Sequence, residues 1–120
     1  MKTHKDLKVW QRSLEFVTVI YMMTKNYPQS EKFGLTNQIR RSAVSIPSNI
    51  AEGSARNHYK EFIQFLYIAL SSASELDTQI RISVNLEFLN KEKSKELLEE
   101  LDSISKMIQG LIRSVKNTNN

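Results

Sequence analysis

Apolar residues recur at three- and four-residue steps along nearly the whole chain, and this helical spacing is the feature that most restricts its possible folds. A side chain that returns every three or four residues lines one face of an α-helix. The chain has only three glycines and two prolines, whereas an all-β protein uses such residues at most of its turns. The sequence therefore predicts an all-α protein.

Breaks in the periodicity divide the 120 residues into four predicted helices. Asp6 and Asn57 are suitable N-caps for the first and the third, Pro28 follows the end of the first, and the fourth follows Asn90. The predicted helices cover residues 7–26, 33–53, 58–88 and 91–116. Helices of this length with short connections favour an up-and-down antiparallel four-helix bundle, which we expect to form a single domain over residues 1–120.

The second predicted helix contains Pro47, which has no N–H to donate and whose ring crowds the carbonyl group of Ala43. A proline inside a straight helix costs about 3 kcal/mol, so we predict a kink or a break near Pro47. The Asn49 amide is placed to bond carbonyl groups that Pro47 leaves free. Gly53 is predicted to be the residue that follows the end of this helix.

The first predicted helix carries two apolar stripes instead of one. The first stripe consists of Leu7, Trp10, Leu14, Val17 and Tyr21, and the second of Val9, Phe16, Ile20 and Met23. One stripe is sufficient for the core of a bundle. Because Phe16, Ile20 and Met23 exceed that need, they are predicted to form an interface between copies of the chain.

Positive charge is concentrated in the first half of the sequence. The formal net charge is +4, and residues 1–60 carry ten Lys and Arg against four Asp and Glu, whereas residues 61–120 carry seven against nine. This asymmetry predicts one electropositive face if the two halves separate in space. The alternative is an ordinary surface charge that keeps the protein in solution.

Two groups of cations are candidates for contacts with phosphate groups. Arg40 and Arg41 are neighbours on a helix, where successive residues are rotated by about 100°, so at least one of them must be exposed. Arg56 and Lys60 flank the loop that follows the same helix. Glu75 lies beside a predicted core position, where it either pairs with Arg41 or is simply exposed.

The sequence offers little that would support catalysis or a cofactor. It has no cysteine, and neither His4 nor His58 has a carboxylate or second histidine at a metal-binding spacing. The pattern Ser103-Ile104-Ser105-Lys106 lies within a heptad helix and has no companion motif. We see neither a signal peptide nor an apolar segment long enough to span a membrane. We therefore expect a non-enzymatic cytoplasmic protein without metal or cofactor.

Several motifs resemble the four-helix bundle proteins of the ribosomal RNA intervening-sequence family. They are Asp6-Leu7-x-Val9-Trp10-Gln11, Tyr27-Pro28, Gln38-x-Arg40-Arg41-x-Ala43-x-Ser45-Ile46-Pro47-x-Asn49-Ile50-Ala51-Glu52-Gly53, Ala69 and Ser72-x-x-Glu75-Leu76. The resemblance covers essentially the whole chain, and it implies a structural role for Ser45, Pro47, Asn49, Glu52, Gly53 and Glu75. One departure is the joint Glu87-Phe88-Leu89-Asn90, which lacks the glycine expected there.

A related branch of the family, the accessory variability determinants of diversity-generating retroelements, forms homopentamers that bind nucleic acid and a reverse transcriptase. The resemblance thus implies a pentamer here, with contacts to RNA or DNA from Arg40, Arg41, Arg56 and Lys60. Two functions remain open at this stage. One is a nucleic-acid-binding accessory factor, and the other is a protein-interaction or scaffold oligomer with no role in nucleic-acid binding.

Overall fold

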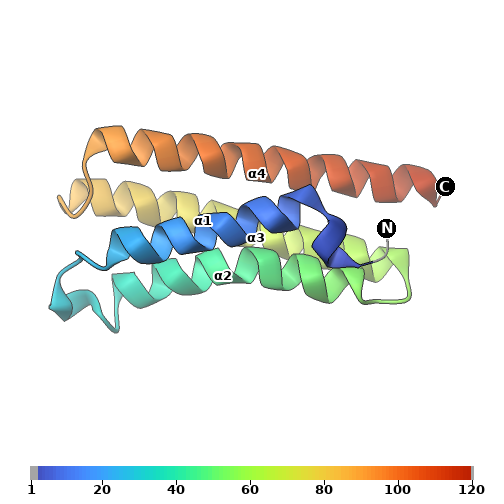
Figure 1. Ribbon diagram of the computed structural model, residues 1–120, viewed down its shortest axis with the longest axis horizontal. Helices are drawn as coiled ribbons and strands as arrows, with labels where there is room; N and C mark the ends of the chain where they lie inside the picture. Colours follow the sequence, from blue (N-terminus) through green and yellow to red (C-terminus); the bar gives the residue numbers. More distant parts are fainter. Residues whose placement is uncertain (1–2, 120) are drawn as a thin grey trace.

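The computed structural model describes residues 3–119, which form four antiparallel helices in up-and-down order (Figure 1). The helices are α1 (Lys8–Thr24), α2 (Leu35–Ser54), α3 (Tyr59–Asn85) and α4 (Lys91–Thr118). Two short 3-10 turns, η1 (His4–Asp6) and η2 (Gln29–Glu31), precede α1 and α2. The predicted all-α bundle is confirmed. Residues 1, 2 and 120 of the predicted domain lie outside the described residues.

The bundle measures 47 × 24 × 19 Å, and both ends of the chain lie at the same end as the α2–α3 connection (Figure 1). One hydrophobic core runs through all four helices. Its fully buried large apolar side chains are Ile20, Ile39, Ile46, Ile50, Leu66, Leu76, Ile80, Ile104 and Ile108. Each contributes about 1.5–3 kcal/mol through removal of apolar surface from water. Isoleucine predominates, and its branched side chain has few rotamers to lose on packing.

Helices α2 and α3 form the closest seam of the bundle, and Gly53 permits this proximity. A Cβ atom at Gly53 would lie 2.7 Å from Cβ of Phe65 and 3.0 Å from Cδ1 of Phe62. Gly53 lies inside α2, and the helix ends with Ser54. The predicted position of Gly53 beyond the helix end is therefore wrong. The residue is needed for close packing and has no positive φ angle.

Helix α2 is continuous from Leu35 to Ser54 with Pro47 buried inside it, so the predicted break is wrong, while a kink stays a prediction. Two polar side chains of α2, Ser45 and Asn49, lie on either side of Pro47 in the sequence and bond each other. The Asn49 amide donates to the carbonyl and to the hydroxyl oxygen of Ser45, both at 2.8 Å. The Ser45 hydroxyl is in turn 2.7 Å from the Ser72 hydroxyl on α3. The prediction that Asn49 bonds the carbonyl freed by Pro47 is therefore wrong, because that carbonyl belongs to Ala43 and Asn49 bonds Ser45. Ser45 itself links α2 to α3.

Helix α1 buries its second apolar stripe most deeply, whereas Leu7, Trp10 and Val17 of the first stripe are only partly buried against the core. Phe16 and Ile20 are buried in the core of a single chain, and Met23 is half-buried against it. The prediction that Phe16 and Ile20 form an interface between copies is therefore wrong, because no second chain can reach them. Leu14 and Tyr21, predicted to be core residues, are instead exposed.

Two buried polar residues explain this choice of stripe. Ser13 and Thr24 lie on the same face of α1 as Phe16 and Ile20. The Ser13 hydroxyl donates to the Trp10 carbonyl at 2.9 Å, and the Thr24 hydroxyl donates to the Ile20 carbonyl at 2.8 Å. A hydroxyl that bonds the preceding turn of its own helix can be buried at little cost. Polar residues therefore occupy the core stripe without disrupting it.

The α3–α4 connection contains the one non-glycine residue with a positive φ among residues 3–119. Glu87 has φ of 64°. The Phe88 N–H donates to the Ser83 carbonyl at 2.9 Å and the Glu87 N–H to the Val84 carbonyl at 3.0 Å, which is the Schellman pattern of a helix C-terminus. Glycine is the usual residue at this position, because it adopts a positive φ without steric cost. Here Glu87 adopts the left-handed conformation in place of the glycine that the sequence lacks.

Candidate functional site

The predicted phosphate-binding residue Arg40 contacts two residues in the last turn of α1, Thr24 and Tyr21. Its Nε donates to the Thr24 hydroxyl at 2.9 Å, and its guanidinium carbon lies 4.5 Å from the centre of the Tyr21 ring. A planar guanidinium over an aromatic face is a favourable contact. Arg40 therefore joins α2 to α1 and presents little of its charge to an outside ligand.

Arg41 lies on the other side of α2 and is exposed. It lines a polar hollow of about 530 Å³ between α2 and α3, together with Glu75 and the Gln79 amide. The salt bridges among the described residues do not include a pair between Arg41 and Glu75, and Glu75 is exposed. Gln79 also lines the hollow, and its side-chain oxygen Oε1 is buried without a hydrogen-bond partner.

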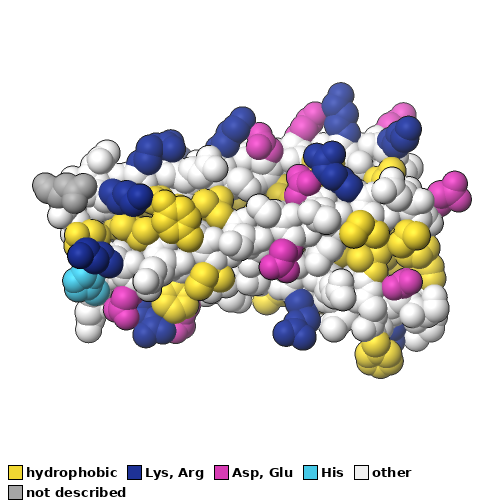
Figure 2. All heavy atoms as spheres, turned by 180° about the vertical axis from the view of Figure 1, so that it is seen from behind, with side chains coloured by type: hydrophobic (Ala, Val, Ile, Leu, Met, Phe, Trp, Pro, Cys, Tyr) yellow, Lys and Arg dark blue, Asp and Glu magenta, His cyan; other side chains and the backbone are white. Residues whose placement is uncertain are grey.

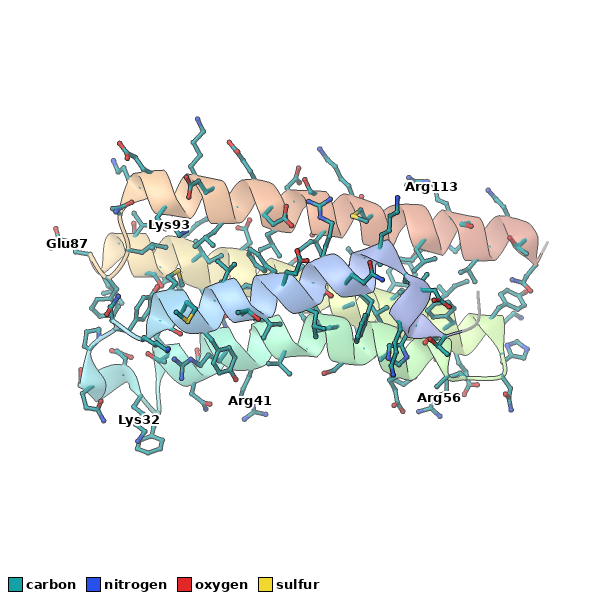
Figure 3. The ribbon with its side chains drawn as sticks, viewed as in Figure 1. Lys32, Arg41, Arg56, Glu87, Lys93 and Arg113 are labelled. Carbon is teal, nitrogen blue, oxygen red and sulfur yellow. The ribbon has the colours of Figure 1, made fainter. Side chains whose placement is uncertain are left out.

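Arg56 and Lys60 lie at the far end of α2 from Arg41. The Arg56 guanidinium is 2.7 Å from the Glu52 carboxylate and lies over the Phe65 ring, so an acidic neighbour offsets its charge. Lys60 is exposed in the first turn of α3. Arg41 and Arg56 are 15 residues apart, which corresponds to about 22 Å along a helix. Figure 3 shows both pointing outward from the same edge of the bundle but well separated.

The four predicted phosphate-binding residues are thus not gathered into one patch. The opposite face of the molecule has no basic patch among its described residues either. Its Lys and Arg side chains are spread around the outline and alternate with acidic ones along the edge formed by α4 (Figure 2). Charge does separate at one end of the bundle. Residues 25–41 carry four cations against one acid, whereas residues 87–102 carry three cations against six acids.

The surface also exposes more apolar side chains than the core stripes predict. Ten large apolar residues are exposed, and they are Leu14, Val19, Tyr21, Met22, Phe33, Val44, Tyr67, Ile68, Ile82 and Leu86. Phe33 is the extreme case, with 88% of its surface exposed. It stands in the loop before α2, at the rim of the polar hollow, with the Lys32 ammonium 5.5 Å from the centre of its ring.

A groove of about 540 Å³ runs between α1 and α4 at the same end of the bundle as Phe33. Its apolar lining consists of Val19, Met22, Met23, Phe88 and Leu89. Of the residues that line this groove, only Met23 was predicted to lie in an interface. Phe33 was missed because it was predicted to be the first residue of the second helix, whereas α2 begins at Leu35. Met22 was missed because it belongs to neither stripe of α1.

Ionisable groups with shifted pKa values have structural explanations. The Glu100 carboxylate accepts hydrogen bonds from Arg12, which raises the pKa of the arginine and joins α1 to α4. Burial raises the pKa of the Tyr27 phenol, and the neighbouring Ser83 hydroxyl opposes part of this rise. His58 acts as the N-cap of α3, since its Nδ1 accepts from the Lys60 N–H at 3.2 Å. None of these groups forms a catalytic arrangement with another.

Residues 3–119 contain no group of three or more His, Asp or Glu side chains that could hold a metal ion. Within the same part of the chain, no helix is sufficiently long and apolar to cross a membrane. The remaining features for a functional role are therefore the polar hollow around Arg41, the exposed Phe33 and the α1–α4 groove.

Comparisons with known proteins agree with this architecture. Residues 5–110 match the family model described as 23S rRNA-intervening sequence protein. A similar solved structure is that of a protein with unknown function from the S23 ribosomal protein family of Bacteroides thetaiotaomicron. The two chains share 27% sequence identity with a TM-score of 0.80, over 88% of this chain and 95% of the other. A search of curated proteins gave no match.

Proposed function

The chain belongs to the 23S rRNA-intervening sequence protein family, and we propose that it is a non-enzymatic cytoplasmic protein that self-associates and acts through its assembled surface. The observation that carries this proposal is the exposed apolar surface, above all Phe33 and the α1–α4 groove. Phe33 and the groove are separate apolar features, and exposed apolar patches such as the groove are typical of contact sites for another macromolecule. The homopentamer implied by the sequence resemblance is one such assembly.

The test of self-association is the molar mass of the purified chain. We expect light scattering at micromolar concentration to give a mass that is a whole-number multiple of 13.9 kDa. Five copies would agree with the resemblance. A mass of one chain over the whole concentration range would contradict the proposal.

A second candidate function is binding of RNA or DNA, alone or together with a reverse transcriptase. Arg41 and Lys60 favour it, since both are exposed and neither belongs to a salt bridge among the described residues. Arg40 and Arg56 support it less, because Thr24, Tyr21 and Glu52 already engage them.

Filter binding of a structured RNA at several salt concentrations tests this second function. Each phosphate contact adds about −0.9 to the slope of log K against log salt on duplex DNA and about −0.7 on single strands. The variant Arg41→Ala/Lys60→Ala should therefore flatten the slope by between one and two. The matched control Arg81→Ala/Lys106→Ala removes the same charge from residues that pair with Asp77 and Asp102. Equal slopes for both variants would remove Arg41 and Lys60 from the binding surface.

A further inference from the structure

The polar hollow between α2 and α3 has unpaired charges of opposite sign on its two walls. Arg41 on α2 and Glu75 on α3 both line it, and both are exposed. Neither forms an ion pair with another of the described residues. A guanidinium only donates hydrogen bonds and a carboxylate only accepts them. The hollow therefore offers donors on one wall and acceptors on the other to a ligand with complementary groups.

The register of the two helices places these charges at the same level. The hydroxyl groups of Ser45 and Ser72, 2.7 Å apart, lie at one end of the hollow. Arg41 lies four residues before Ser45 on α2, and Glu75 lies three residues after Ser72 on α3. Because α2 and α3 run antiparallel, both steps lead about 4.5–6 Å in the same direction from the serine contact. Arg41 and Glu75 thus line opposite walls at one level.

Amide side chains line the next turn away from the serines, and an aromatic ring stands at the rim. The amides are those of Asn37 and Gln38 on α2 and of Gln79 on α3. The Gln79 Oε1 oxygen has no hydrogen-bond partner, so no bond at this oxygen fixes the terminal torsion of the amide. At the rim, 88% of the surface of Phe33 is exposed, and the Lys32 ammonium lies over its ring. The hollow thus presents charges, amides and an aromatic face in that order.

A flat base with hydrogen-bonding edges fits this order of groups. The volume of about 530 Å³ lies in the range of pockets that hold a small organic molecule. Unpaired bases of RNA are bound by stacking on an aromatic side chain and by hydrogen bonds to their edges. Phe33 is a suitable platform because its loop is fixed. The Gly34 N–H donates to the Glu31 carbonyl and the Leu35 N–H to the Glu31 carboxylate, both at 3.0 Å.

Guanine is the base whose two edges match the two charged walls. Its N7 and O6 atoms are acceptors, and they suit the guanidinium of Arg41. Its ring N–H and its exocyclic amino group are donors, and they suit the carboxylate of Glu75. Adenine in the same position would turn its amino group toward Arg41 and a ring acceptor toward Glu75. Both walls therefore favour guanine over adenine.

We propose that the α2–α3 hollow binds an unpaired guanine base, which stacks on Phe33, accepts from Arg41 and donates to Glu75. This inference rests on the nucleic-acid-binding function given above as the second candidate and names the group that is recognised. Two sources carry this base, a single-stranded RNA segment and a free guanine nucleotide. Arg41 points outward from the edge of the bundle, where either source can reach it (Figure 3). The hollow and the α1–α4 groove share no lining residue, so an assembly formed through the groove leaves the hollow accessible.

Matched oligonucleotides test the recognition of guanine. The probes are short labelled oligouridines that carry one central guanosine or one central adenosine, and fluorescence anisotropy measures their binding to the full chain. The guanosine probe should bind about 5- to 150-fold more tightly, which is the range expected of one good bidentate base contact. Equal binding of the two probes would overturn this arm of the proposal and leave RNA binding intact.

Two variants test the contacts. Glu75→Gln exchanges an acceptor oxygen for a donor, so it should remove most of the preference for guanosine without weakening the adenosine probe. Phe33→Ala removes the stacking platform and should weaken both probes about 5- to 150-fold, because stacking tolerates any base. The matched control is Glu61→Gln, at an exposed residue of α3 outside the hollow, and it should keep the wild-type preference. Full preference in Glu75→Gln would overturn the proposed contact. Circular dichroism checks that the variants remain helical.

Calorimetric titration with guanosine monophosphate and adenosine monophosphate separates the two sources of the base. Binding of the guanosine nucleotide but of neither oligonucleotide would identify a free nucleotide as the ligand, which supports the site and contradicts the RNA function. A guanosine preference among the oligonucleotides without binding of the free nucleotide would identify an RNA strand. Absence of both would overturn the proposal, whether or not the chain binds RNA.

Discussion

The α2–α3 seam and the α1–α4 seam are built in different ways. At the first, Gly53 removes the side chain that would separate the helices, and a hydrogen bond between Ser45 and Ser72 joins them. At the second, a groove remains and the Arg12–Glu100 ion pair, roughly 40% exposed on each side, spans the helices. The surface hollow along the α2–α3 seam is lined by polar side chains, whereas the α1–α4 groove is lined mainly by apolar ones. The bundle thus combines one closely packed seam with one that is looser and more apolar at its surface.

The largest expected effect comes from filling the close seam. Gly53→Val should lower the free energy of unfolding by about 3 kcal/mol, because its Cβ would overlap Phe65 and Phe62 and force α2 from α3. Urea denaturation measures this. The control is Gly110→Ala in α4, where a new Cβ meets only the end of Arg113 at 3.7 Å. Greater helix propensity should make that variant about 0.5–1 kcal/mol more stable. Equal stability of both variants would contradict the role given to Gly53.

A smaller effect is expected when the polar link of the same seam is cut. Ser45→Ala should cost about 1–2 kcal/mol, because the buried Ser72 hydroxyl loses its partner and the Asn49 amide loses one acceptor. Ser48→Ala, an exposed serine on the same helix, serves as the matched control and should change stability little. Thermal unfolding followed by circular dichroism distinguishes them. If the two variants melt alike, the link contributes nothing to the seam.

The α3–α4 connection, next to the groove, should respond in the opposite direction. Glu87→Gly should raise the free energy of unfolding by about 1 kcal/mol, because glycine adopts the left-handed conformation at φ of 64° without the steric cost of a Cβ. The same change at Glu92, in the first turn of α4, should instead destabilise the protein. Denaturant midpoints compare the two. Destabilisation by Glu87→Gly would show that the carboxylate side chain has a contact that outweighs the strain.

The smallest effect is expected at the ion pair of the loosely packed seam. Arg12→Ala should lower the free energy of unfolding by less than about 1 kcal/mol, because both partners are partly exposed to water. The loss should shrink further in 0.5 M salt, where the wild-type pair is screened. Chemical denaturation at low and high salt checks both statements. A loss as large as that of Gly53→Val would remove the distinction between the two seams.

Much of the fold follows from the sequence, because helical periodicity and end signals are local properties. Helix α4 begins directly after Asn90 as predicted, and the Asn90 side chain accepts from the Lys93 N–H at 2.7 Å. The predicted N-caps Asp6 and Asn57 are wrong, because Leu7 precedes α1 without a side-chain cap and His58 caps α3. The side of α1 that faces the core could not be predicted, because counting apolar residues ignores hydroxyl groups that bond their own helix, as at Ser13 and Thr24. The two stripes contain similar numbers of apolar residues, so packing against the other helices determines which of them is buried.

The candidate surface could be predicted only in part. Adjacent arginines indicate that at least one is exposed, and Arg41 is, but the contact of Arg40 with Tyr21 depends on how α1 crosses α2. The exposure of Phe33 could not be predicted, because the sequence placed it at the start of the second helix, whereas the structure places it in the loop before α2. The groove is a property of two helices far apart in the sequence, so no local pattern reports it.

The position of both chain ends has a practical consequence for labelling. They lie beside the α2–α3 connection, at the other end of the bundle from the α1–α2 connection, which carries Phe33 (Figure 1). Fluorophores or fused domains attached at either terminus would therefore leave Phe33 and the α1–α4 groove unobstructed.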